Sequence, residues 1–171
     1  DLVDGHRQDD LGTDPASLEG ARDDQAIAVL RHHIDHEPKP SGMAWLMLLD
    51  LYRHADQHRQ FTEIAQRFRL EFNAETPNWD DLSPLDDPGL VAFPHLIGRI
   101  RDEWATPECR NIIEDLLYDN QGGKRIGFSL PAFRDLLQLH GIVETYLLKR
   151  EVYGKTDSRK RVAPLTPPAP P

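Results

Sequence analysis

The sequence predicts an all-α protein that consists of two small helical units. Apolar residues recur at steps of three to five positions through most of the chain, which is the period of an amphipathic helix. The interruptions of this pattern fall at prolines, glycines and residues that cap helices. The length of 171 residues suits one domain or two small ones. We therefore expect a disordered acidic arm over 1–16, a helical unit over 17–79, an acidic proline-rich joint over 80–92, a second helical unit over 93–153 and a basic proline-rich tail over 154–171.

The two ends of the chain differ in charge. Residues 1–24 contain eight acidic and two basic side chains, and few apolar residues precede Leu18. Such a segment cannot bury enough apolar surface to offset the entropy of ordering, so we expect residues 1–16 to be disordered. Residues 149–161 contain six basic and two acidic side chains, and five of the 14 prolines fall within 164–171. Because the chain begins without Met, we expect a processed or excised piece of a longer protein.

The first expected helix covers residues 17–36. Its apolar positions are Leu18, Ala21, Ala26, Leu30 and Ile34. Pro38 and Pro40 stop it, because proline cannot donate the backbone hydrogen bond that a helix interior needs.

Two further helices are expected in the first unit. Ser41 is a candidate N-cap for a helix over 42–55, which is apolar on nearly every side and is therefore expected between neighbours. After a polar turn, a third helix is predicted to end near Asn73, with an apolar face formed by Phe61, Ile64, Ala65, Phe68 and Phe72. Short connections make such helices antiparallel neighbours.

The second and third helices can be compared with the tetratricopeptide pattern of paired helices. Four residues of the second helix occupy the expected places: Trp45, Leu48, Leu49 and Tyr52. For the third helix the pattern expects a small residue, a large one four positions later and a small one three positions after that. The sequence has the reverse order of sizes, with Phe61, Ala65 and Phe68 at these positions. Two crossing helices can still interdigitate with a shifted contact, so we expect a tetratricopeptide-like unit, with a plain helical bundle as the alternative.

Residues 44–79 (AWLMLLDLYRHADQHRQFTEIAQRFRLEFNAETPNW) resemble the tetratricopeptide-type segment of bacterial FimV-like proteins. That family is associated with type IV pilus assembly and polar organisation, and its helical repeats lie in the cytoplasm. The resemblance covers roughly the first half of the expected ordered region. It implies a cytoplasmic adaptor or scaffold in a type IV pilus or related cell-envelope system.

The second unit is expected to contain three helices. The first spans Phe93 to Trp104, and Thr106 with Pro107 gives an N-cap and a first helical residue for the next. The last helix is predicted to begin near Pro131 and to continue for about five turns.

A glycine-rich segment separates the last two helices. Residues 118–130 break the helical period, and paired glycines allow a tight reversal, so we expect a turn or a short β-hairpin with Ile126 and Phe128 pointing inward. Lys124 and Arg125 at its tip are candidates for contact with an anion or an acidic partner.

The sequence contains little evidence for a metal site or a catalytic site. His32 and His36 have the i, i+4 spacing of a zinc chelate, with His33 between them, but no second ligand cluster accompanies them, so we expect a solvated helix face and no metal site. Cys109 falls in the first turn of a predicted helix without a neighbouring base, so we expect a buried structural cysteine. We expect no enzyme and no cofactor.

The composition argues against two classes of protein, those that bind nucleic acid and those that span a membrane. The formal charge of −9 argues against binding to nucleic acid, and no apolar run approaches the about 20 residues of a membrane-spanning helix. We expect a cytoplasmic adaptor that binds a protein partner through its helical repeats, with Asp50, Arg53 and His54 in an open channel. The alternative is a regulatory module in which Lys124, Arg125 and the histidines of the first helix contact a small anion or metal. The oligomeric state stays open.

Overall fold

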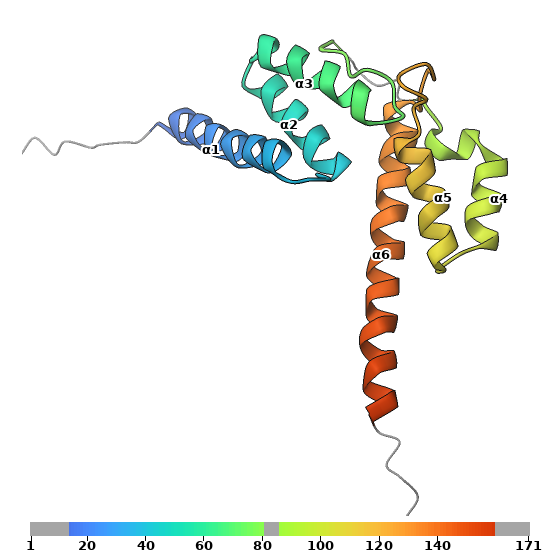
Figure 1. Cartoon of the computed structure of the whole chain (residues 1–171). Coiled ribbons are helices and arrows are strands. Elements are labelled where there is room, and N and C mark those ends of the chain that lie inside the picture. Colours follow the sequence, from blue (N-terminus) through green and yellow to red (C-terminus); the bar gives the residue numbers. More distant parts are fainter. Residues whose placement is uncertain (1–13, 81–85, 160–171) are drawn as a thin grey trace, which may run out of the picture. The chain divides into compact units, whose positions relative to one another are not determined.

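The computed structural model describes residues 14–80 and 86–159, and within these ranges it contains helices and no strands (Figure 1). The predicted all-α class is therefore confirmed for this part of the chain. The elements in order are α1 (Pro15–His36), α2 (Gly42–His54), α3 (His58–Glu71), the 3-10 helix η1 (Gly89–Ala92), α4 (Pro94–Asp102), α5 (Pro107–Tyr118) and α6 (Leu130–Arg159). Among the described helices, none combines the length and the apolar character needed to cross a bilayer. Most of the predicted arm, part of the joint and the end of the tail lie outside the described residues.

Side-chain caps fix the beginnings of three helices. The Ser41 hydroxyl accepts a hydrogen bond from the Met43 backbone N–H at 3.2 Å, and the Thr106 hydroxyl accepts one from the Cys109 N–H at 3.1 Å. Both predicted caps are therefore confirmed. Helix α1 begins earlier than expected, because Asp14 also accepts an N-cap bond and Pro15 supplies the first helical residue. Residues 15 and 16 of the predicted arm thus belong to α1.

The chain forms two compact units, with a division between Ala65 and Gln66 inside α3. The sequence placed a joint at 80–92 instead. The first unit contains α1, α2 and the beginning of α3, and the second contains the end of α3 and everything after it.

In the first unit, α1 packs against α2, and an arginine ties α1 to α3. Arg31 forms ion pairs with Asp35 at 3.0 Å and with Glu63 at 2.7 Å. Burial alone would lower the pKa of Arg31, but hydrogen bonds with Tyr52, Glu63 and Asp35 raise it above its usual value. The buried apolar residues include Ile34, Trp45, Leu48, Leu49, Tyr52, Phe61 and Ile64, as the helical period predicted.

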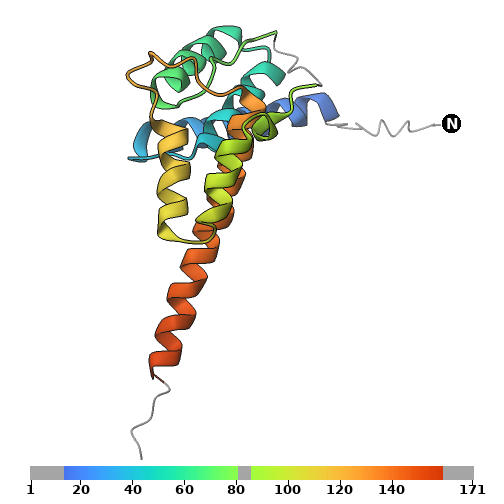
Figure 2. The ribbon, with the colours of Figure 1, turned by 90° about the vertical axis from the view of Figure 1, so that its right-hand side faces the viewer.

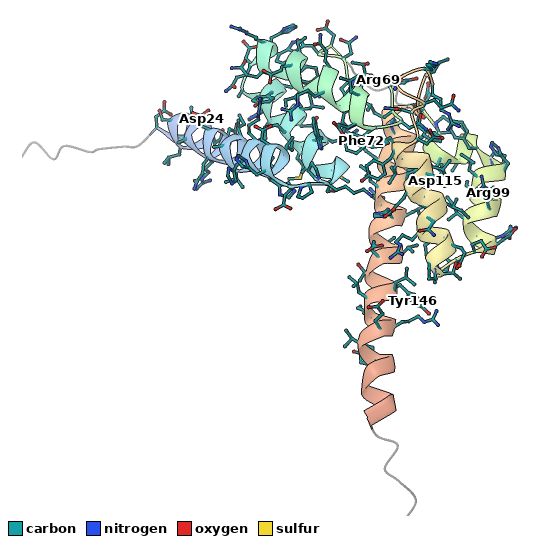
Figure 3. All side chains as sticks on the ribbon, in the orientation of Figure 1. Asp24, Arg69, Phe72, Arg99, Asp115 and Tyr146 are labelled. Atoms are coloured by element: carbon teal, nitrogen blue, oxygen red, sulfur yellow. The ribbon has the colours of Figure 1, made fainter. Side chains whose placement is uncertain are left out.

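In the second unit, α5 lies beside the first half of α6, and α4 packs against α5 and η1 (Figures 1 and 2). The shared core contains Phe68, Phe72, Ile113, Leu117, Phe133, Leu136 and Val143. Figure 3 shows Tyr146 on the part of α6 that extends beyond α5. The prediction of about five turns was too short, since α6 has 30 residues. The four residues at 148–151 (LKRE) are good helix formers, so the helix continues after its buried apolar residues end.

Two buried asparagines join the C-terminal ends of α3 and α5. The Asn73 amide donates to the Leu116 carbonyl at 2.9 Å, and the Asn120 amide donates to the Leu70 carbonyl at 2.8 Å. The last carbonyls of a helix have no partner within it, so each asparagine satisfies an unpaired carbonyl of the other helix. These two hydrogen bonds hold in place the start of the glycine-rich segment that follows α5.

The glycine-rich segment forms a turn, and no hairpin occurs within it. Phe128 instead makes an isolated bridge to Ala74, with its N–H donating to the Asn73 carbonyl at 3.0 Å. Phe128 is buried as predicted, but the expectation that Ile126 points inward was wrong, since Ile126 is 82% exposed. Without a second strand in the segment, no pleat directs the two side chains to the same face.

Cys109 is a buried structural residue, as the sequence predicted. Its side chain is fully buried, and its Sγ lies 3.6 Å from the Ile100 carbonyl oxygen. Burial raises the pKa of the thiol above its ordinary value, although the residue lies in the first turn of α5.

Candidate functional site

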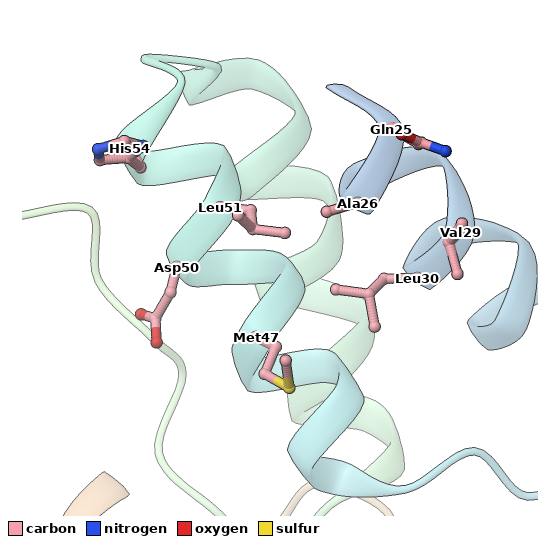
Figure 4. A pocket seen from close by; sticks show the side chains of 8 residues that line it. All are labelled: Gln25, Ala26, Val29, Leu30, Met47, Asp50, Leu51 and His54. Carbon is pink, nitrogen blue, oxygen red and sulfur yellow. The ribbon is translucent and has the colours of Figure 1, made fainter. Parts of the chain in front are cut away.

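An open apolar groove runs between α1 and α2 in the first unit (Figure 4). Its volume is about 800 Å³, within the range of ligand-binding sites in proteins. The lining residues are Gln25, Ala26, Val29, Leu30, Met47, Asp50, Leu51 and His54.

The groove arises because α1 and α2 contact each other through only part of their apolar surfaces. Figure 4 shows Ala26 and Leu30 of α1 pointing toward Leu51 and Met47 of α2. Val29 is 63% exposed, and Met47 is 52% exposed. The apolar surface at the groove is therefore open to solvent, which is typical of surfaces that bind another molecule.

Polar residues lie along the α2 side of the groove (Figure 4). The His54 ring nitrogen Nδ1 lies 2.7 Å from a carboxylate oxygen of Asp23, which links α2 to α1. Asp50 pairs with Arg53 at 3.1 Å, one turn along α2. The guanidinium of Arg53 also lies 5.0 Å above the ring of Phe61, which is the geometry of a cation–π contact.

Two of the three residues predicted in the first unit line the groove. Asp50 and His54 do so, whereas Arg53 lies beside it and contacts Asp50 and Phe61. The apolar lining, above all Val29 and Met47, was not predicted from the sequence. In the sequence both are apolar residues within predicted helices, and this property does not distinguish an exposed position from a buried one.

Lys124 and Arg125 lie in the second unit, so the two predicted sets of binding residues belong to different units. Lys124 is exposed, and Arg125 pairs with Asp119 at 3.4 Å. Behind the turn, the Arg69 guanidinium donates to the backbone carbonyls of Gly123 and Arg125. These contacts hold the backbone of the turn and leave the Lys124 side chain at the surface.

The backbone amides of the turn are engaged within the chain. The Asn120 side-chain oxygen accepts from the N–H groups of Gly122 at 3.0 Å and Gly123 at 3.3 Å. Gly122 and Gly123 have φ values of 66° and 82°, the left-handed conformation that glycine tolerates. An anion would have to compete with Asn120 for these amides.

The histidines of α1 form a stacked pair. The rings of His32 and His36 have centroids 4.0 Å apart, and Nδ1 of His36 lies 2.9 Å from the His32 carbonyl oxygen. This leaves Nε2 of His36 for any other contact.

A different set of residues brings three metal-type ligands together. Glu114 of α5 and His140 and Glu144 of α6 place one donor atom each within 4.8 Å of the others. This set was not among the sites predicted from the sequence. The i, i+4 spacing of His140 and Glu144 was an available signal, but the third residue comes from a separate helix.

Comparison of the chain with families of known proteins, with curated proteins and with solved structures finds no match.

Proposed function

We propose that the protein is a non-enzymatic adaptor that holds an apolar segment of a partner protein in the groove between α1 and α2. The occupant is an amphipathic helix whose apolar face carries basic residues at its margins. The observation that carries this proposal is the exposed apolar surface of Val29 and Met47 within a groove of about 800 Å³.

The geometry of the groove favours a helix as the occupant. Two packed helices present parallel ridges of side chains, and a third helix can seat its own ridge between them at an axis separation of about 8 to 10 Å. Recognition of this kind uses apolar anchors at i, i+3 or i+4 and i+7. The apolar lining along the groove, Ala26 and Leu30 facing Leu51 and Met47, offers contacts for such a row of anchors.

Charge favours a basic margin on the partner segment. The described residues of the first unit, 14–65, contain nine acidic and five basic side chains. The groove itself has one carboxylate, Asp50, beside its apolar floor. Opposite charge on the partner would steer association and fix the orientation of the segment, and added salt would weaken both effects.

The wider role rests on the sequence. The resemblance of residues 44–79 to FimV-like proteins supports a tetratricopeptide-like unit and a cytoplasmic partner in a type IV pilus or related cell-envelope system. Lys124 and Arg125 of the second unit provide a separate basic surface for an acidic region of the same partner. This surface is proposed as secondary to the groove.

The test is direct binding of a purified partner, first identified by photo-crosslinking from position 47 in the native host. Met47→Lys should weaken binding at least about tenfold, because it places a charge on the apolar floor and repels a basic segment. Val91→Lys is the matched control, since Val91 is an exposed aliphatic residue in the second unit.

The controls separate the two surfaces. Equal affinities of wild type, Met47→Lys and Val91→Lys would contradict the role of the groove. The double variant Lys124→Glu with Arg125→Glu should weaken binding less than Met47→Lys does. If it weakens binding more, the glycine-rich turn is the primary contact and the groove is not.

A further inference from the structure

Three potential metal ligands converge where α5 packs on α6 in the second unit. Nε2 of His140 lies 3.2 Å from a carboxylate oxygen of Glu114. Glu144 follows His140 by one helical turn, and the donor atoms of all three residues lie within 4.8 Å of one another. One imidazole and two carboxylates are ligands that divalent transition metals use in proteins.

The helices that carry these ligands are held by a packed core. Ile113 precedes Glu114 in α5, Leu117 follows it by about one turn, and both are fully buried, as is Val143 of α6. The ligands therefore project from two backbones whose positions are fixed by apolar contacts, and ligands on such rigid elements are placed more accurately than ligands on loops. The three side chains themselves are half-buried, with 24% to 36% of their surface exposed, so an ion can reach them.

We propose that Glu114, His140 and Glu144 bind a divalent transition-metal ion, with zinc as the preferred ion. The site joins α5 to α6 through three protein ligands and leaves a fourth position for water. It uses none of the groove residues, and so it stands independently of the proposed adaptor function. It also differs from the histidine pair of α1, since it combines ligands from two helices.

The distances suit zinc after a small movement. Zinc bonds of about 2.0 to 2.2 Å in tetrahedral geometry place neighbouring ligand atoms about 3.3 Å apart. The His140 and Glu114 atoms already have this separation. No pair has to close by more than roughly 1.5 Å, which rotation of the partly exposed Glu144 side chain can supply.

The local charge also balances for a dication. Two carboxylates compensate a charge of +2 when the imidazole is neutral. Without an ion, Glu144 has a weaker cationic neighbour, since Nη1 of Arg110 lies 3.6 Å from its carboxylate. Arg110 is partly exposed and can turn to solvent, so it acts as a competitor for Glu144. The imidazole favours zinc over magnesium or calcium, which prefer all-oxygen sites.

The test is calorimetric titration of zinc into the purified full chain after treatment with a chelator. We expect one zinc ion per chain with a dissociation constant at or below the micromolar range, and no comparable binding of magnesium. At a hundredfold excess over the dissociation constant, zinc should raise the unfolding midpoint by about 5 to 10 °C. Cobalt in place of zinc should give visible absorption bands that report direct coordination.

Three variants assign the ligands. Glu144→Gln preserves the shape of the side chain and should weaken zinc binding at least about tenfold, and His140→Ala should do the same, because each removes one ligand. Arg110→Ala should tighten binding by removing the competing cation. The double variant His32→Ala with His36→Ala is the matched control and should bind zinc as wild type does.

Two results would overturn the proposal. One is the absence of stoichiometric zinc binding to the wild-type chain. The other is binding that survives Glu144→Gln and His140→Ala but disappears in the His32→Ala, His36→Ala variant, which would move the site to α1.

Discussion

Substitution of Gly127 by alanine tests how the glycine-rich segment is held against the chain after α3. Gly127 has a φ of +88°, a conformation that costs a residue with a side chain about 1 to 2 kcal/mol. A Cβ at this position would also lie 2.5 Å from the Ala74 carbonyl carbon and 2.7 Å from its oxygen. Both are backbone atoms, so no side-chain rotation relieves the clash.

Relief of that clash requires the segment around Ala74 to move away. The movement breaks two backbone hydrogen bonds, from the Phe128 N–H to the Asn73 carbonyl at 3.0 Å and from the Glu75 N–H to the Phe128 carbonyl at 2.8 Å. Each contributes about 1 kcal/mol. Together with the cost of the positive φ, we expect Gly127→Ala to lower the free energy of unfolding by about 3 to 4 kcal/mol.

Gly122→Ala is the matched control. Gly122 has a φ of +66°, but a Cβ there meets no atom within 4 Å. Only the conformational cost applies, so we expect a loss of about 1 to 2 kcal/mol. Urea unfolding followed by circular dichroism gives both values. If Gly127→Ala destabilises the protein by no more than Gly122→Ala, the close approach of Gly127 to Ala74 is not what holds this segment.

Two further predictions concern buried groups of the second unit. Asn120→Ala should lower the free energy of unfolding by about 1 to 3 kcal/mol in urea titrations, because it leaves the Leu70 carbonyl and the Gly122 N–H without their partner; a change below 0.5 kcal/mol would contradict this role. The raised pKa of Cys109 means that its thiol ionises at a lower pH in the unfolded chain than in the folded one. The buried neutral thiol therefore contributes fully to the free energy of unfolding below pH 9, and this contribution is lost as pH rises through the folded pKa. Unfolding at pH 8 and pH 10 should therefore show a smaller alkaline loss in Cys109→Ala than in wild type, and equal losses would refute the assignment.

The helix boundaries were largely predictable because their signals are local. Pro38 ends α1, and Ser41 and Thr106 cap α2 and α5, as their residue types indicate. The end of α6 was not predictable in this way. No proline or capping residue stops the helix near Leu147, and residues 148–154 carry no buried apolar side chain that marks the continuation.

The candidate sites were less predictable because they depend on pairing between helices. Val29 and Met47 are apolar residues in apolar surroundings, and only the packing of α1 on α2 decides that they stay exposed. Likewise, Glu114 is 26 residues from His140, and only the packing of α5 on α6 makes them neighbours. Local periodicity identifies a helix face, but it does not say which face meets another helix.

Nuclear magnetic resonance of the methionine methyl groups tests the proposed groove most directly. The chain has two methionines, Met43 and Met47, so a sample labelled at the methionine methyls gives two signals, which a Met43→Leu variant assigns. Met47 lines the groove. The proposed role of the groove predicts that the Met47 signal shifts or broadens when the purified partner is added. A saturated complex in which the Met47 signal is unchanged would contradict it.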